Sequence, residues 1–285
     1  MHLVTMRVKD STRAGRLEGA RVVELPHRDV GALLEAGEEA LLDAQSGDGK
    51  AHELGTVSLA PPIPRPGKIF CVGLNYRSHI AEMGRQPDEF PTLFATYADA
   101  LVGPRDPIEL PPQSEQIDWE AELAIVIKHP VRNAGEREAA AAIAGFTIYN
   151  DVTARDWQRR TTQWLQGKTF ERTSPLGPAV VTVDETGVRP ELQIACEIDG
   201  WRAQEGSTAD LVFDPPSIVR YLSTILTLRP GDVIATGTPA GVGAGLDPPR
   251  YLRAGQVVRT SIEGLGELIN PCVSLAEAEM IARRP

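Results

Sequence analysis

Two glutamates separated by one residue, Glu120 and Glu122, stand at the start of an apolar run that continues to Ile127. If this run is a β-strand, successive side chains alternate between its faces, so both carboxylates project the same way. Two adjacent carboxylates repel each other, and they need a shared proton, a partner Lys or Arg, or a divalent cation. The alternative is an edge strand whose charged face lies in water.

A third carboxylate, Asp151, follows the apolar run from Ala144 to Asn150. At the end of a strand it would face a cleft, whereas at a helix cap or a turn it would serve only the local backbone. Together with Glu120 and Glu122, it would complete a set of three hard oxygen ligands. Such a set suits Mg²⁺, Mn²⁺ or Ca²⁺ and leaves positions free for water or a chelating substrate.

His79 and Glu82 are three residues apart in a segment with helical character, Tyr76 to Met83. On one helix face the carboxylate could fix the imidazole tautomer and make His79 a general base; the alternative is an incidental ion pair on a solvated turn. Lys168 is one of only five lysines. Its compact ammonium could neutralise a developing oxyanion or enolate, although a surface lysine is the ordinary interpretation.

A glycine-rich segment, GDVIATGTPAGVG, spans Gly231 to Gly243. It lacks the pattern of a phosphate-binding loop, and its glycines do not open a dinucleotide-binding unit. Thr236, Gly237 and Thr238 could hold a substrate carboxylate through backbone amides and hydroxyls, or they could form a tight turn between strands.

The composition excludes several classes of partner and site. A formal net charge of -10 disfavours nucleic acid as the main ligand. Five histidines and three scattered cysteines argue against a zinc or disulfide framework. The first residues contain charges and no apolar signal region, and no apolar run is long enough to cross a membrane. We therefore expect a cytoplasmic protein with no membrane partner.

The elements that must position these residues divide into two parts. Residues 1–64 form a small appendage that contains two strand-like runs and one helical stretch but no aromatic residue, and a proline-dense segment ends it. Residues 65–285 carry short strand-like runs punctuated by Pro and Gly, with few helices, which predicts a β-rich α+β domain. The expected helices there are 76–83, 137–144, 155–164 and 217–226.

Five motifs in this order resemble the fumarylacetoacetate hydrolase family, in particular its bacterial acylpyruvate-hydrolase-like members. They are FCVGLNYRSHIAEM, DWEAELAIVI, YNDVTARDWQ, GKTF and GDVIATGTPAGVG, and the likeness extends from about Ile69 to Val273. The resemblance implies a mixed β-roll or sandwich domain, a homodimer and a site for Mg²⁺ or a similar ion.

The resemblance also implies roles for individual residues. Metal ligands would be Glu120, Glu122 and Asp151, and catalytic residues would be His79, Glu82 and Lys168. The positions that match substrate-binding residues are Tyr76, Arg155, Gln158, Gly237 and Thr238. One departure concerns Thr96, which stands where many relatives carry a lysine near the substrate.

The implied activity is hydrolytic cleavage of a carbon–carbon bond in a β-diketo acid, an acylpyruvate or fumarylpyruvate, to pyruvate and a carboxylic acid. Within the same site, decarboxylation of oxaloacetate or isomerisation of a 2-hydroxy-dienedioate needs the ion and an enolate but no attacking water. Since Thr96 replaces a cation, a catalytically silent binder of a 2-oxo acid is a further alternative.

Overall fold

The structure, a computed structural model, describes residues 1–9 and 11–282 and has the β-rich α+β architecture that the sequence predicts. A twelve-stranded sheet runs through the molecule in the order β4-β3-β2-β1-β14-β12-β11-β17-β6-β7, with β5 beside β1 and β8 beside β14. Its strands are β1 (His2–Val8), β2 (Ser11–Glu18), β3 (Arg21–Glu24), β4 (Ala51–Glu53), β5 (Leu59–Ala60), β6 (Ile69–Gly73), β7 (Thr92–Thr96), β8 (Leu101–Val102), β11 (Ala121–Ile127), β12 (Ile143–Asn150), β14 (Ser174–Thr182) and β17 (Val233–Ala235).

A second sheet of five strands has the order β16-β15-β18-β19-β9, and a two-stranded ladder joins β10 to β13. These strands are β9 (Ile108–Leu110), β10 (Ile117–Asp118), β13 (Thr153–Ala154), β15 (Gln193–Ile198), β16 (Trp201–Ser207), β18 (Val257–Ile262) and β19 (Gly266–Ser274). The helices are α1 (Val30–Glu35), α2 (Glu38–Ser46), α3 (Arg77–Glu82), α4 (Glu136–Ala141), α5 (Arg155–Gln158), α6 (Leu165–Lys168), α7 (Val183–Thr186), α8 (Pro215–Ile225) and α9 (Leu275–Ala282).

Strand β11 is buried along its whole length because both of its faces are covered. Leu123 and Ile125 point into a core shared with Cys196 and Val258 of the five-stranded sheet. Ala124 and Val126 lie in a second hydrophobic core, on the opposite face of the large sheet. By the same alternation, the even-numbered carboxylates of this segment lie on the face turned away from the five-stranded sheet.

The N-terminal elements extend the large sheet and share a hydrophobic cluster with the rest of the chain. Strand β1 pairs antiparallel with β14, where His2 lies opposite Val181. Leu3 and Leu33 pack in the same hydrophobic cluster as Val180 of β14. This burial offsets the absence of aromatic residues from the appendage.

Two expected helices are shorter than the sequence pattern suggested. The alanine-rich segment stops at Ala141 because Ile143 begins β12, where it pairs with Ile127 of β11. The helix that begins at Arg155 ends at Gln158. Beyond it, the hydroxyl of Thr161 accepts a hydrogen bond from the amide of Gln163, a local contact that competes with continued helix.

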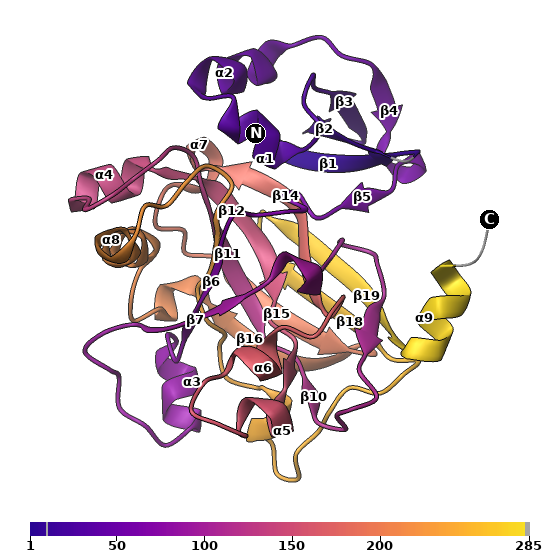
Figure 1. The fold of residues 1–285 in the computed structure, drawn as a ribbon, viewed down its shortest axis with the longest axis vertical. Coiled ribbons are helices and arrows are strands. Elements are labelled where there is room, and N and C mark those ends of the chain that lie inside the picture. The colour runs from indigo at the N-terminus through magenta and orange to yellow at the C-terminus, as the bar shows by residue number, and fades with distance from the viewer. Residues whose placement is uncertain (10, 283–285) are drawn as a thin grey trace.

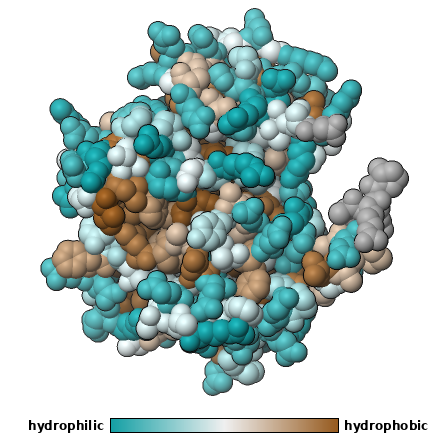
Figure 2. Space-filling model, in the orientation of Figure 1, coloured by the Kyte–Doolittle hydropathy of each residue, from teal (hydrophilic) through white to brown (hydrophobic). Residues whose placement is uncertain are grey.

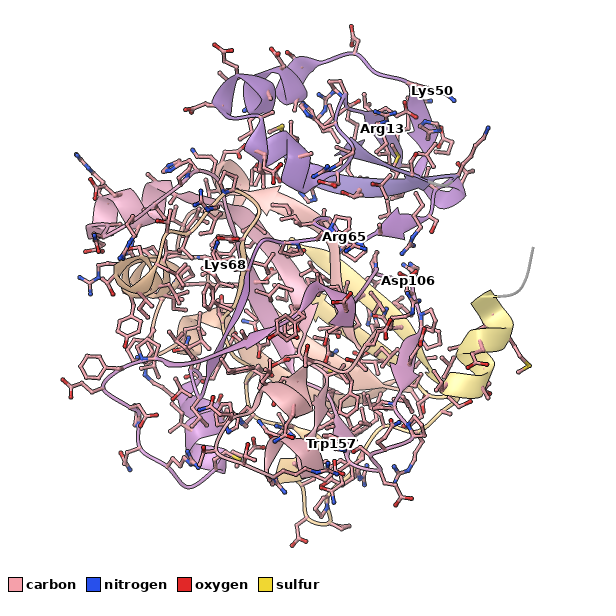
Figure 3. All side chains as sticks on the ribbon, viewed as in Figure 1. Arg13, Lys50, Arg65, Lys68, Asp106 and Trp157 are labelled. Atoms are coloured by element: carbon pink, nitrogen blue, oxygen red, sulfur yellow. The ribbon has the colours of Figure 1, made fainter. Side chains whose placement is uncertain are left out.

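The N-terminal elements gather at one end of the molecule, and α3, α5 and α6 lie toward the other (Figure 1). Trp157, on α5, therefore lies far from Arg13 and Lys50 of the appendage (Figure 3). Figure 2 shows hydrophilic residues over both ends and a hydrophobic patch between them on this face. No helix in the described ranges is both long and apolar enough to span a membrane.

Candidate active site

The ends of two paired strands bring three carboxylates together. Strands β11 and β12 are antiparallel, and Ala121 lies opposite Asn150. The residues just outside this pair are joined as well, because the amide of Asp151 donates to the carbonyl of Glu120 at 2.9 Å. The carboxylates of Glu120, Glu122 and Asp151 offer ligand atoms that all lie within 4.8 Å of one another, and all three side chains are buried. The edge-strand alternative is thereby excluded.

Lys168 lies inside this cluster and is not a surface residue. Its ammonium donates to Oε2 of Glu120 and to Oδ2 of Asp151, each at 2.7 Å, and its side chain is 1% exposed. Helix α6 presents it from a position close to α5: a Cβ on Gly167 would come within 2.4 Å of the amide nitrogen of Gln158. Only glycine at position 167 allows this approach.

Thr96 holds the backbone of Lys168 in place. The Thr96 hydroxyl is buried and donates to the carbonyl oxygen of Lys168 at 2.8 Å. The ring of Phe94, two residues earlier on β7, has its centroid 5.2 Å from the Lys168 ammonium. Position 96 thus contacts the backbone of α6 and does not reach the cavity described below.

Arg155 connects the triad to its surroundings. Its Nε donates to Asp118 Oδ2 at 2.8 Å, and its Nη1 lies 2.7 Å from Glu120 Oε1. The same Nη1 donates to Gln158 Oε1 at 3.1 Å. Within the described part of the chain Nη2 has no hydrogen-bond partner, so the buried guanidinium keeps one nitrogen for another ligand.

Asp118 is a central residue to which sequence reasoning gave no role. Besides Arg155, it accepts hydrogen bonds from the amides of Trp119, Gly243 and Ala244 at 2.7–2.9 Å. A Cβ on Gly243 would lie 2.7 Å from its Oδ1, so the close approach requires glycine. The only sequence signal was its position in the DWEAELAIVI motif, because its partners lie far away along the chain.

The charges around the triad shift the pKa values of its members in different directions. Burial alone would raise the pKa of Glu120, but Lys168 and Arg155 lower it to about 2. Burial raises the pKa of Asp151 to about 6, even though Lys168 acts against the rise. Burial and the charges of Asp151 and Glu120 raise the pKa of Glu122 well above its usual range.

These shifts indicate that Lys168 and Arg155 do not neutralise the cluster completely. The pKa of Lys168 itself is raised by Asp151 and Glu120 against the effect of burial. In addition, Oδ1 of Asp151 is buried and has no hydrogen-bond partner among the described residues. A hard divalent cation would satisfy both features, so the residues present fit such an ion, with Glu120, Glu122 and Asp151 as its ligands.

The predicted pairing of His79 and Glu82 is confirmed. Nδ1 of His79 lies 2.8 Å from Glu82 Oε2, and Glu82 Oε1 accepts a hydrogen bond from the amide of Gly241 at 2.8 Å. Burial alone would raise the pKa of Glu82, but the hydrogen bonds from His79 and Gly241 lower it. Glu82 therefore both orients the imidazole and attaches helix α3 to the glycine-rich loop.

The glycine-rich loop uses its hydrogen-bond donors to hold strand β11, so fewer of them are free to bind a substrate. The Gly237 amide donates to Glu122 Oε2 at 2.8 Å, and the Thr238 hydroxyl donates to the carbonyl of Ala121 at 2.9 Å. Gln204 of β16, another residue not predicted, donates to Thr238 Oγ1 at 2.8 Å and accepts from the Ala121 amide at 2.9 Å. These contacts differ from the carboxylate-binding nest that the sequence suggested, although Gly237 and Thr238 do line the cavity.

Tyr76 does not reach the site. Its side chain is fully buried in the core that separates the two sheets, and it is not among the residues that line the cavity. Tyr76 is the N-cap residue of α3, directly before the helix that carries His79 and Glu82. The sequence predicted a substrate-binding tyrosine, whereas the structure shows Tyr76 packed in the core.

Glu120, Glu122 and Lys168 line one cavity of about 280 Å³, and Asp151 contacts Lys168 behind its wall. Its polar wall includes His79, Glu120, Glu122, Arg155, Gln158 and Lys168, together with Arg85, Arg159, Thr161 and Thr238. The remaining wall is largely apolar and includes Val72, Leu74, Met83, Phe94, Trp164 and Val242. A small acid with a short carbon chain suits this combination.

A carboxylate triad, a buried ammonium and a His-Glu pair around one cavity are typical of enzymes that act on an acid substrate with the help of a divalent ion. Residues 68–273 match the model of the fumarylacetoacetate (FAA) hydrolase C-terminal domain. The chain therefore belongs to the fumarylacetoacetate hydrolase family, as its motifs indicated.

Three relatives illustrate the range of activities in this family. The chain is 41% identical, over 267 residues, to the mitochondrial oxaloacetate tautomerase fahd2 of Xenopus laevis, covering 90% of this chain and 84% of that protein. A fumarylacetoacetate hydrolase from Exiguobacterium antarcticum superposes with a TM-score of 0.86 at 34% identity, covering 96% and 99% of the two chains. A 5-carboxymethyl-2-hydroxymuconate delta-isomerase from Mycobacterium smegmatis gives 0.79 at 34% identity, with the same coverage. These relatives are enzymes, but hydrolysis is only one of their activities.

Proposed function

We propose that this protein catalyses keto-enol isomerisation of a 2-oxo dicarboxylic acid, in the manner of an oxaloacetate tautomerase. The observation that carries the proposal is the arrangement of an imidazole and an ammonium, His79 and Lys168, on the wall of one cavity beside a carboxylate triad. The likeness to the Xenopus laevis tautomerase supports it. The sequence suggested decarboxylation of oxaloacetate or isomerisation of a 2-hydroxy-dienedioate as alternatives to hydrolysis, and tautomerisation shares with them an enolate and no attacking water. The relatives favour this group of reactions over hydrolysis.

Tautomerisation requires that one proton leaves the carbon next to the ketone and that one proton reaches the carbonyl oxygen, with no net consumption of water. A divalent ion at the triad, Mg²⁺ or Mn²⁺, would polarise the 2-oxo acid and make the carbon acid easier to ionise. His79, held by Glu82 at 2.8 Å, is the base that accepts the carbon-bound proton. Lys168 and the unpartnered Nη2 of Arg155 stabilise the negative charge that develops on oxygen.

Hydrolysis of a β-diketo acid is the second candidate. The His79-Glu82 pair favours it, because the same base could deprotonate a water molecule. The likeness to the Exiguobacterium antarcticum hydrolase also agrees with it. The two candidates differ in one chemical respect: hydrolysis breaks a carbon–carbon bond and releases pyruvate, whereas tautomerisation leaves the carbon skeleton intact.

A substrate panel with product analysis tests the proposal. Enol-oxaloacetate, acylpyruvates and a 2-hydroxy-dienedioate would be supplied to the wild-type protein with Mg²⁺ or Mn²⁺, and with EDTA as control. We expect metal-dependent acceleration of the decay of the enol absorbance, with no pyruvate or CO₂ above the buffer blank. Release of pyruvate from an acylpyruvate, without acceleration of enol decay, would establish the hydrolase instead.

A further inference from the structure

Two arginines on the cavity wall have no role in the chemistry described above. Arg85 lies just beyond α3, and Arg159 directly follows α5. Both are exposed, and neither guanidinium has an ion pair or a side-chain hydrogen bond within the described residues. Their backbones are fixed, since the Arg85 amide donates to Ile80 at 3.0 Å and the Arg159 amide donates to Arg155 at 3.2 Å.

The charges at the inner end of the cavity provide no cation for a second carboxylate of the substrate. Two carboxylates, Glu120 and Glu122, line that end, and two more, Asp118 and Asp151, lie behind it in contact with the two cations Arg155 and Lys168. A divalent ion would bring the net charge of these groups to zero, and it would bind the 2-oxo acid end of a substrate. Any further carboxylate must find its partner elsewhere on the wall.

Arg85 and Arg159 are suited to that task. A guanidinium can bind a carboxylate in a bidentate manner, and one that is not already paired breaks no protein contact on binding. The apolar side chains of Met83 and Trp164, which line the same cavity, match the short carbon chain between the two ends of a diacid. A monocarboxylate with an apolar tail would leave both guanidinium groups without a counter-ion.

We propose that Arg85 and Arg159 together bind the distal carboxylate of a 2-oxo dicarboxylic acid, and that they thereby select diacids over monoacids. The proposal rests on the proposed function for the orientation of the substrate, with its 2-oxo acid end toward the triad. It assigns substrate selectivity to positions outside the five sequence motifs and outside the metal site.

The affinities of two inert ligands that differ only in a distal carboxylate distinguish specific binding of that carboxylate from a general attraction of anions. Oxamate carries only the 2-oxo acid head, and N-oxalylglycine carries the same head with an additional distal carboxylate. Calorimetric titration with Mg²⁺ present would compare the wild type with Arg85→Gln, Arg159→Gln and the double variant. Arg160→Gln is the control, because Arg160 is adjacent in sequence but stacks 3.5 Å from the centroid of the Trp157 ring and does not line the cavity.

We expect the double variant to lose about 10- to 100-fold in affinity for N-oxalylglycine, the range for charged hydrogen bonds, while its affinity for oxamate is unchanged. The control should behave as the wild type with both ligands. An equal loss for both ligands, an equal loss in Arg160→Gln, or no loss at all would overturn the proposal. Failure of the proposed function would be seen separately, as absence of enol turnover by the wild type.

Discussion

Asp118 and Arg155 form a 2.8 Å ion pair whose carboxylate has no exposure to solvent. The pair connects β10, the α5 segment and the glycine-rich loop, because the same carboxylate accepts hydrogen bonds from the amides of Gly243 and Ala244. The arrangement around the triad depends on this contact, although neither residue belongs to the triad.

Replacement of Asp118 by alanine should damage both stability and activity. The change leaves the Nε of the buried Arg155 and three backbone amides without their acceptor. Loss of one partner from a buried ion pair costs about 3–5 kcal/mol. Urea denaturation would measure the loss of unfolding free energy. Asp48→Ala, at an exposed aspartate, is the control, and equal stability of the two variants would contradict this assignment.

Removal of the Lys168 charge should change turnover and metal affinity in opposite directions. In Lys168→Met, Glu120 and Asp151 lose the cation that lies 2.7 Å from each, so the triad should bind Mg²⁺ more tightly. At the same time the developing oxyanion loses its ammonium, and kcat should fall by about 100-fold or more. Calorimetry and steady-state rates check the two effects, with Lys50→Met as the control. Weaker Mg²⁺ binding would be inconsistent with the role given to Lys168.

Glu120 and Glu122 should respond to neutral substitution with opposite signs of stability in the metal-free protein. Glu120→Gln removes a charge that Lys168 and Arg155 stabilise, so Tm should fall. Glu122→Gln removes a charge that Asp151 and Glu120 repel, while the new amide oxygen can still accept the hydrogen bond from Gly237. The Tm should therefore rise by about 2–4 °C for each kcal/mol of repulsion removed. Both variants should lose the additional stabilisation by Mg²⁺. Differential scanning calorimetry with EDTA and with Mg²⁺ measures both effects; equal shifts in EDTA would refute the charge distribution.

The attachment of α3 through Glu82 should be lost in acid. The folded-state pKa of Glu82 is lowered by hydrogen bonds from His79 and Gly241, so its stabilising contribution is fully present above the ordinary glutamate pKa and disappears as pH falls through the lowered value. The difference in unfolding free energy between wild type and Glu82→Gln should therefore be largest near neutral pH and shrink in acid. A difference that grows as pH falls would show the opposite sign of linkage.

Local patterns were sufficient to predict most of the site. Alternation along the apolar run placed Glu120 and Glu122 on one face, and helical spacing brought His79 to Glu82. Asp151 follows an apolar strand, where a carboxylate can face a cleft, and the family resemblance favoured this interpretation over a cap or a turn. Each of these predictions depended on neighbours within a few residues of the chain.

The parts that could not be predicted depend on partners distant in sequence. No local sequence pattern marks Asp118, because its carboxylate accepts hydrogen bonds from the amides of Gly243 and Ala244, which lie far along the chain. The contact of Gln204 with Ala121 is likewise set by the packing of the two sheets. Thr96 was interpreted through a lysine in relatives, yet its hydroxyl contacts the Lys168 backbone, which only the folded chain reveals.

The most direct test of the central claim is deuterium exchange at C3 of oxaloacetate in D₂O, followed by NMR. With Mg²⁺, the wild type should accelerate exchange above the buffer rate and release no pyruvate above the buffer blank. Asp151→Ala should abolish the acceleration, and His79→Ala should reduce it by about 10²- to 10⁴-fold. Exchange at the buffer rate in the wild type, together with metal-dependent cleavage of a β-diketo acid, would contradict the account.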